Sequence, residues 1–235
     1  MDACQFAVFV HLAAGTVALA TFWAAALARK GSPLHVAIGR TYLAAMCLVL
    51  VTSAGLAAAF ITGGRPAIGT FLAYLVVITA TACWLAWRAI RTKRTPERYF
   101  GRGLRRIGWL NLGAGLLTFG IGVQLGIGLL MLFSWIGILG GAVMVRQAGQ
   151  SPAGNPRWWL REHYLNVLGM GVATHVAFLS LGLNRLLAPF GIEPPQMIGW
   201  TLPLVVALLA GAWLDRRYGA RRSAGGAIAG SPGPV

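Results

Sequence analysis

The stretch LREHYLNVLGMGVATHVAF, residues 160–178, is mostly apolar and long enough to enter a membrane, yet it carries Glu162, His163 and His175. Ionisable side chains are rare inside membrane helices, because their burial in lipid costs free energy, and they commonly serve a function. We therefore expect a membrane helix whose imidazoles either bind a cofactor or form hydrogen bonds to neighbouring helices.

The whole chain has the composition of an integral membrane protein. Of its 235 residues, 57% are hydrophobic and only 11% are charged, which is too apolar for a soluble domain of this length. Its three cysteines show no CxxC spacing, so neither a disulfide framework nor a zinc knuckle is indicated. Arginine greatly outnumbers lysine, and Ala and Gly are abundant, which suggests a GC-rich bacterial gene and a place in the bacterial cytoplasmic (inner) membrane.

Seven apolar runs lie near the length of roughly 20 residues that a bilayer-spanning helix needs. Their limits are residues 4–28, 34–61, 67–90, 107–125, 127–145, 158–183 and 196–214. The Gly-rich GIGVQLGIG, residues 120–128, separates the fourth run from the fifth, because residues 107–145 are too many for a single span. The sequence thus predicts an all-α bundle of seven transmembrane helices over residues 1–215, followed by a basic, disordered tail over residues 216–235.

The distribution of basic residues predicts the orientation of this bundle. Cytoplasmic loops collect Lys and Arg, and the loops of a seven-span chain alternate between the two sides. Eighteen of the twenty basic residues fall on one side, and only Arg65 and Arg185 fall on the other. We therefore expect the N-terminus outside and the C-terminus in the cytoplasm.

The formal net charge of +15 has two explanations. The basic segment RAIRTKRTPERYFGRGLRRIGW, residues 88–109, contains interleaved aromatic residues and could form a nucleic-acid patch. We favour an interfacial loop held against anionic lipid headgroups, with Tyr99, Phe100 and Trp109 at the boundary, and expect no nucleic-acid partner.

Glycines recur through the fourth and fifth runs, including small-xxx-small spacings such as Gly122 with Gly126 and Gly137 with Gly141. Such helices can approach each other closely, and close packing is the favoured interpretation. Room for a flat cofactor is the alternative.

The four histidines of the chain form two expected pairs. At about 1.5 Å per residue, His11 and His175 both lie roughly 25 Å from the cytoplasmic end of their helices. His35 lies in the first turn of its helix, where Ser32 suits the N-cap and Pro33 the first helical position. Because His163 lies near the start of its helix, it joins His35 at the cytoplasmic level.

Two imidazoles at one level from separate helices are the axial ligands of a membrane b-type haem. The sequence predicts haem b with His11 and His175 as outer ligands and His35 and His163 as inner ligands, for transmembrane electron transfer to an unidentified redox partner. Lys30 and Arg40 could pair with haem propionates, and Tyr42 would support the ligands. Gly15 and Gly171, each four residues from a ligand, leave room for a flat ring.

Other assignments for the same residues stay open. His163 and His175 are twelve residues apart and so differ by about 120° around the helix, which does not suit a shared cleft. The candidate ligands for a zinc or iron ion, as in a membrane metalloenzyme, are His11, His35, His163, His175 and Glu162. The inner site would be built from His35, His163 and Glu162, although two imidazoles with one carboxylate make an incomplete set. A transporter is a third possibility. The histidines could also simply bond across helices, and Glu162 could pair with Arg161 or Arg40.

Three segments resemble a family of bacterial membrane proteins known as the domain of unknown function 2306. They are HLAAGTVALA at residues 11–20, RKGSPLHVAIGRTYLAAM at residues 29–46 and WLREHYLNVLGMGVATHVAF at residues 159–178. The residues that carry the resemblance are His11, Lys30, Gly31, His35, Gly39, Arg40, Tyr42, His163, Ala177 and Phe178. The family pattern contains no equivalent of His175, and three histidines favour one cluster over two haems.

Overall fold

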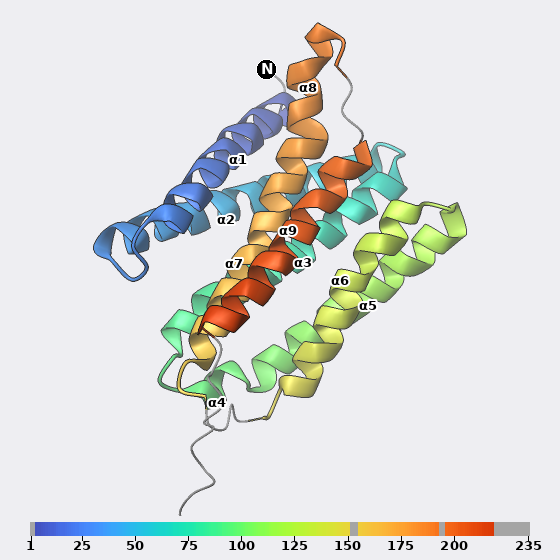
Figure 1. Cartoon of the computed structure of the whole chain (residues 1–235). Helices are drawn as coiled ribbons and strands as arrows, with labels where there is room; N and C mark the ends of the chain where they lie inside the picture. The colour runs from blue at the N-terminus through green and yellow to red at the C-terminus, as the bar shows by residue number, and fades with distance from the viewer. Residues whose placement is uncertain (1–2, 151–154, 193–195, 219–235) are drawn as a thin grey trace, which may run out of the picture.

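The structure is a computed structural model that describes residues 3–150, 155–192 and 196–218. Within these ranges every regular element is a helix (Figure 1). The elements are α1 (Ala3–Leu27), α2 (Pro33–Thr62), α3 (Pro66–Arg91), α4 (Pro96–Tyr99), α5 (Arg102–Leu125), α6 (Gly128–Gln147), α7 (Trp158–Ala177), η1 (Phe178–Gly182), α8 (Leu183–Leu187), η2 (Ala188–Phe190) and α9 (Gln196–Tyr218).

Six helical segments among the described residues are long and apolar enough to cross a membrane. They are Cys4–Leu27, Pro33–Thr62, Pro66–Arg91, Pro96–Leu125, Gly128–Gln147 and Met197–Tyr218. The chain is therefore an all-helical protein with the features of a multi-pass membrane protein. The α7 helix, which we expected to belong to the sixth of seven spans (residues 158–183), is not among these six because it carries more polar residues.

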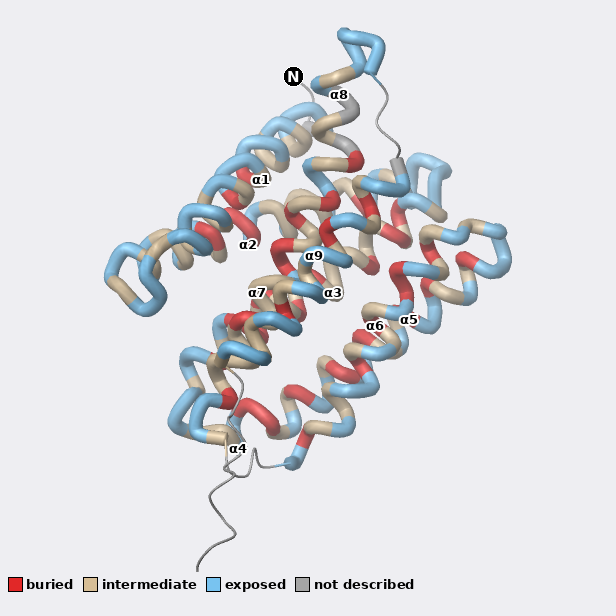
Figure 2. The backbone as a smooth tube through the Cα atoms, in the orientation of Figure 1, coloured by how far each residue is buried: buried red, intermediate tan, exposed pale blue. Residues whose placement is uncertain are grey.

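Two helical hairpins flank a central layer (Figure 1). The α1–α2 hairpin lies on one side and the α5–α6 hairpin on the other, and α3 contacts helices of both as well as α7. The α7 helix contacts α1, α3 and α9. Exposed residues cover the outward sides of α1, α9 and α5, where an apolar surface suits lipid (Figure 2).

Local sequence signals set the ends of these helices. The Ser32 side chain accepts a hydrogen bond from the backbone N–H of His35 at 3.2 Å, and Pro33 occupies the first helical position, which confirms the expected N-cap of α2. Gly126 adopts φ +65° at the end of α5, a conformation that favours glycine, and α6 begins two residues later. The expected division of residues 107–145 into two helices is confirmed.

Glycines bring α5 and α6 into backbone contact. A Cβ atom added at Gly141 would lie 2.5 Å from the backbone nitrogen of Leu112 and 2.6 Å from the carbonyl oxygen of Gly108. A Cβ atom at Gly115 would lie 2.8 Å from the nitrogen of Ile138. These glycines therefore serve close helix packing, which is the interpretation that the small-xxx-small spacing favoured.

The segment after α7 continues as helix. It passes through the π-helical turn η1 and then α8, so that residues 158–187 form one helical rod. At the other end of the chain, α9 extends to Tyr218 and includes the first three residues of the expected tail. Residues 219–235, for which we expected disorder, lie outside the described residues.

We expect Gly141→Ala to destabilise the protein, because the new methyl group meets backbone atoms that cannot move aside. The expected loss is about 1–3 kcal/mol of unfolding free energy, as for other overpacked sites. Gly140→Ala is the matched control, since a Cβ atom there meets nothing within 4 Å. Denaturant unfolding in detergent micelles measures both variants, and equal stability of the two would contradict the role assigned to Gly141.

Candidate functional site

The turn between α1 and α2 places Lys30 and His35 beside the end of α1. Gly31 adopts φ +78°, which lets the chain reverse, and Ser32 then starts α2. The Lys30 ammonium donates to the carbonyl oxygens of Ala25, at 2.9 Å, and of Ala26 in the last turn of α1. Partial burial lowers the pKa of the Lys30 ammonium from its ordinary value.

His35 and His163 are anchored in the same way by two different helices. The Nδ1 atom of His35 lies 3.1 Å from the carbonyl oxygen of Ala25, and that of His163 lies 3.1 Å from the carbonyl oxygen of Ala86. Because a carbonyl can only accept, each Nδ1 carries the proton and each Nε2 keeps a lone pair. His163 also lies within range of electrostatic repulsion from His35 and Lys30, which acts between their charged forms.

His175 has a different environment. Its Nδ1–H donates to the carbonyl oxygen of Gly171 at 2.7 Å, and its Nε2 accepts from the indole N–H of Trp23 at 2.9 Å. Both ring nitrogens are therefore bonded within the protein. A Cβ atom at Gly171 would lie 2.6 Å from the Phe22 ring, so Phe22 fills the space in which we expected room for a flat cofactor.

His11 bonds to α2 and not to His175. Its Nδ1 lies 3.0 Å from the hydroxyl oxygen of Thr52, which itself donates to the carbonyl of Leu48 and therefore accepts from the imidazole. The partner of His175, Trp23, follows His11 by twelve residues, or about 18 Å along α1. The structure thus separates the two histidines that we expected at one outer level, and each has its own hydrogen-bond partners.

Tyr42 and Arg40 lie farther along α2. Tyr42 is buried, its ring packs edge-on against Phe22, and its hydroxyl lies 3.4 Å from that of Thr174 on α7. This contact joins α2 to α7 two turns beyond His35. Arg40 is exposed on the surface of α2.

Glu162 belongs to an aromatic cluster at the start of α7. The Tyr99 hydroxyl donates to its Oε2 at 3.0 Å, and Tyr99 packs between Phe100 and Trp158 with ring centroids 4.9 and 5.0 Å away. Within residues 3–150, 155–192 and 196–218, no group of three or more His, Cys, Asp or Glu side chains could hold a metal ion.

Arg161 pairs with Asp215 of α9, and not with Glu162 as one of our expectations had it. The guanidinium makes two hydrogen bonds to this carboxylate, at 3.0 and 3.1 Å, and the Tyr164 hydroxyl also donates to Asp215. Sequence reasoning missed Asp215 and Trp23, and it placed Tyr99 at the lipid boundary, whereas Tyr99 is buried and bonds to Glu162. The sequence offered one indication of the role of Asp215. Acidic residues are scarce in this chain and arginines are many, so each carboxylate is expected to pair with an arginine.

Comparisons with protein-family models, with curated proteins and with solved structures find no match for this chain. The resemblance to the domain of unknown function 2306 remains a sequence-based expectation. The candidate site therefore rests on the hydrogen bonding of His35 and His163 and on the charge of Lys30 within range of His163.

We expect Tyr99→Phe to destabilise the start of α7, because it removes the hydroxyl that donates to Glu162. Leaving a buried acceptor without its donor costs about 1–3 kcal/mol. In the background of Glu162→Gln, the same substitution should cost less, since an amide can find a replacement partner more easily than a carboxylate. Thermal unfolding of the four proteins of this cycle measures the coupling, and purely additive effects would contradict it.

Proposed function

We propose that this protein binds one b-type haem between His35 and His163 and uses it for electron transfer. The observation that carries the proposal is the matched hydrogen bonding of the two imidazoles. Each imidazole donates its Nδ1–H to a backbone carbonyl, so that the lone pair of Nε2 could bind a metal. Histidine ligands to metals commonly have this arrangement. The two rings come from separate helices, as the axial ligands of a membrane haem do.

The residues around His35 fit such a group. Gly39 follows His35 by one turn on the same face of α2, is half-buried, and has no atom within 4 Å of the position of a Cβ. Lys30 supplies a cation beside the two imidazoles, where a propionate could be neutralised, and Tyr42 holds α2 against α7. A bound haem would supply one-electron chemistry, and the chain would supply its orientation and an apolar surrounding.

The carbonyl groups of Ala25 and Ala86 have a chemical role in this proposal. A hydrogen bond from Nδ1–H to a carbonyl fixes the ring orientation and makes the opposite nitrogen a stronger donor. Ala86 is almost completely buried, so its bond to His163 is shielded from water. His163 is then the more firmly oriented of the two ligands.

Seven membrane spans, with the N-terminus outside, belong to the same proposal. The rod of residues 158–187 would be about 45 Å long, enough to cross a bilayer as the seventh helix. Its polar residues would be tolerated because α1, α3 and α9 contact it. The Arg-rich ends of α3, α5 and α9 would lie in the cytoplasm of a bacterium, and the haem near that side of the inner membrane.

The absorption spectrum of the detergent-purified protein, supplied with haem during expression, tests the proposal. We expect sharp b-type bands after reduction with dithionite, and we expect His35→Ala and His163→Ala each to lose them. His11→Ala and His175→Ala are the matched controls and should keep the bands, because these imidazoles bond elsewhere. Added imidazole should restore the bands of His35→Ala, which separates ligand loss from misfolding.

Three results would overturn this assignment. The first is a colourless protein that also takes up no haem on reconstitution. The second is loss of the bands in His11→Ala or His175→Ala but not in His35→Ala. The third is a stoichiometric zinc content without haem, which elemental analysis of the same sample would reveal.

A further inference from the structure

Four cations lie over the faces of tryptophan rings, and we name this set the tryptophan–cation belt. Within the described part of the chain, the distances from the charged atom to the ring centroid run from 4.3 to 5.7 Å. The pairs are Arg88 with Trp84, Arg91 with Trp87, Lys93 with Trp159, and Arg217 with Trp213.

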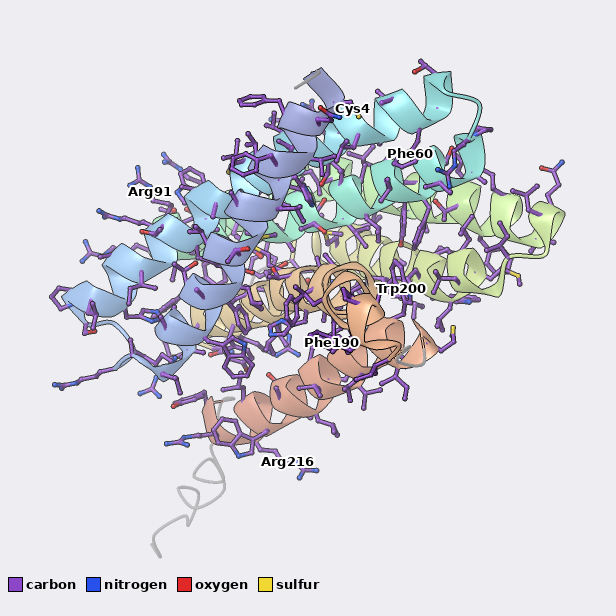
Figure 3. The ribbon with its side chains drawn as sticks, turned by 90° about the horizontal axis from the view of Figure 1, so that it is seen from above. Cys4, Phe60, Arg91, Phe190, Trp200 and Arg216 are labelled. Atoms are coloured by element: carbon purple, nitrogen blue, oxygen red, sulfur yellow. The ribbon has the colours of Figure 1, made fainter. Side chains whose placement is uncertain are left out.

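All four pairs lie at one end of the helical bundle. Lys93 and Trp159 connect the end of α3 to the start of α7, and the Arg161–Asp215 ion pair connects the start of α7 to the end of α9. At the opposite end of α3, Arg65 lies 5.1 Å from the centroid of the Phe60 ring. Figure 3 labels Arg91 and Phe60 and shows them at opposite ends of the molecule.

Within residues 3–150, 155–192 and 196–218, no acidic side chain forms an ion pair with a cation of the belt. Residues 88–106 contain eight cations and one acid, Glu97. The ion pair found among the described residues, between Arg161 and Asp215, uses neither Glu97 nor any cation of the belt. Arg88 donates to the backbone carbonyl of Arg98, while its buried Nε has no hydrogen-bond partner. An anion from outside the chain would balance the positive charge of these cations.

The position of the belt indicates which anion this is. Its cations lie at or just beyond the ends of the candidate spans Pro66–Arg91 and Met197–Tyr218, where a bilayer presents its headgroups. Tryptophan rings prefer the same interfacial level, and a ring face below a guanidinium holds the cation there. One guanidinium group can donate two parallel hydrogen bonds to two oxygens of a phosphate, and a lipid phosphodiester offers such oxygens.

We propose that the tryptophan–cation belt binds the phosphate groups of anionic phospholipids in one leaflet and selects them over zwitterionic phospholipids. The belt gathers α3, α7 and α9 around the bound headgroups. Since Lys93 and Trp159 join two of these helices, lipid binding also fixes the start of α7. This inference does not depend on haem binding.

Native mass spectrometry of the full chain, released from micelles that contain equal amounts of phosphatidylglycerol and phosphatidylcholine, tests the proposal. The variant is Arg91→Gln with Lys93→Gln, because both side chains are exposed. We expect its ratio of bound phosphatidylglycerol to phosphatidylcholine to fall by about fivefold for each cation removed. Arg65→Gln is the matched control, since it removes a cation from an aromatic face at the other end, and should leave the ratio unchanged.

Competition experiments distinguish a lipid phosphate from a free phosphate. Glycerol phosphate and inorganic phosphate, added at the concentration of the lipid, should not displace phosphatidylglycerol if the whole lipid is recognised. Displacement by either, an equal fall of the ratio in Arg65→Gln, or an unchanged ratio in the double variant would overturn the proposal. So would tighter binding of a single-stranded oligonucleotide with the same dependence on Arg91 and Lys93.

Discussion

Polar groups in an apolar surrounding must find their partners inside the protein, and α7 is the helix on which this constraint falls most heavily. Its side chains find those partners on five other elements. Glu162 accepts from Tyr99 of α4, His163 bonds to Ala86 of α3, Thr174 faces Tyr42 of α2, and His175 accepts from Trp23 of α1. The Arg161–Asp215 pair adds α9. The polar face of α7 thus determines which helices surround it.

The same constraint explains why α7 can be less apolar than its neighbours. A helix whose polar groups are bonded to adjacent helices does not present them to lipid, so it needs less hydrophobic surface of its own. The outer helices show the opposite pattern, because α1 and α9 expose long rows of Leu, Val, Phe and Trp. Hydropathy alone therefore identifies the outer helices and the apolar central helix α3, but it overlooks α7, whose polar side chains make most of the contacts described above.

Sequence patterns predicted local features such as helix ends and glycine contacts well. They predicted poorly at which level of the bundle each histidine lies. Ser32, Pro33, Gly126 and the glycines of α5 and α6 act through neighbours a few residues away or through simple steric rules, and the structure confirms them. The pairing of His11 with His175 assumed that all helices stand parallel and start at one level. That assumption does not hold for α1 and α7, because His175 faces Trp23 near the end of α1. Helix tilt depends on packing between distant segments, and the spacing of residues along one chain does not reveal it.

The bonding of each imidazole determines how readily it can bind a metal. His175 has both nitrogens engaged, so binding through either would first break a hydrogen bond, at a cost of about 1 kcal/mol or more, and expose an unsatisfied indole N–H or carbonyl. His35 and His163 need no such change, because the bonds that hold their Nδ1 atoms also leave Nε2 with its lone pair. Of the four histidines, these two are the ones whose Nδ1 bonds to a backbone carbonyl of another helix, which is why our proposal assigns the haem to them.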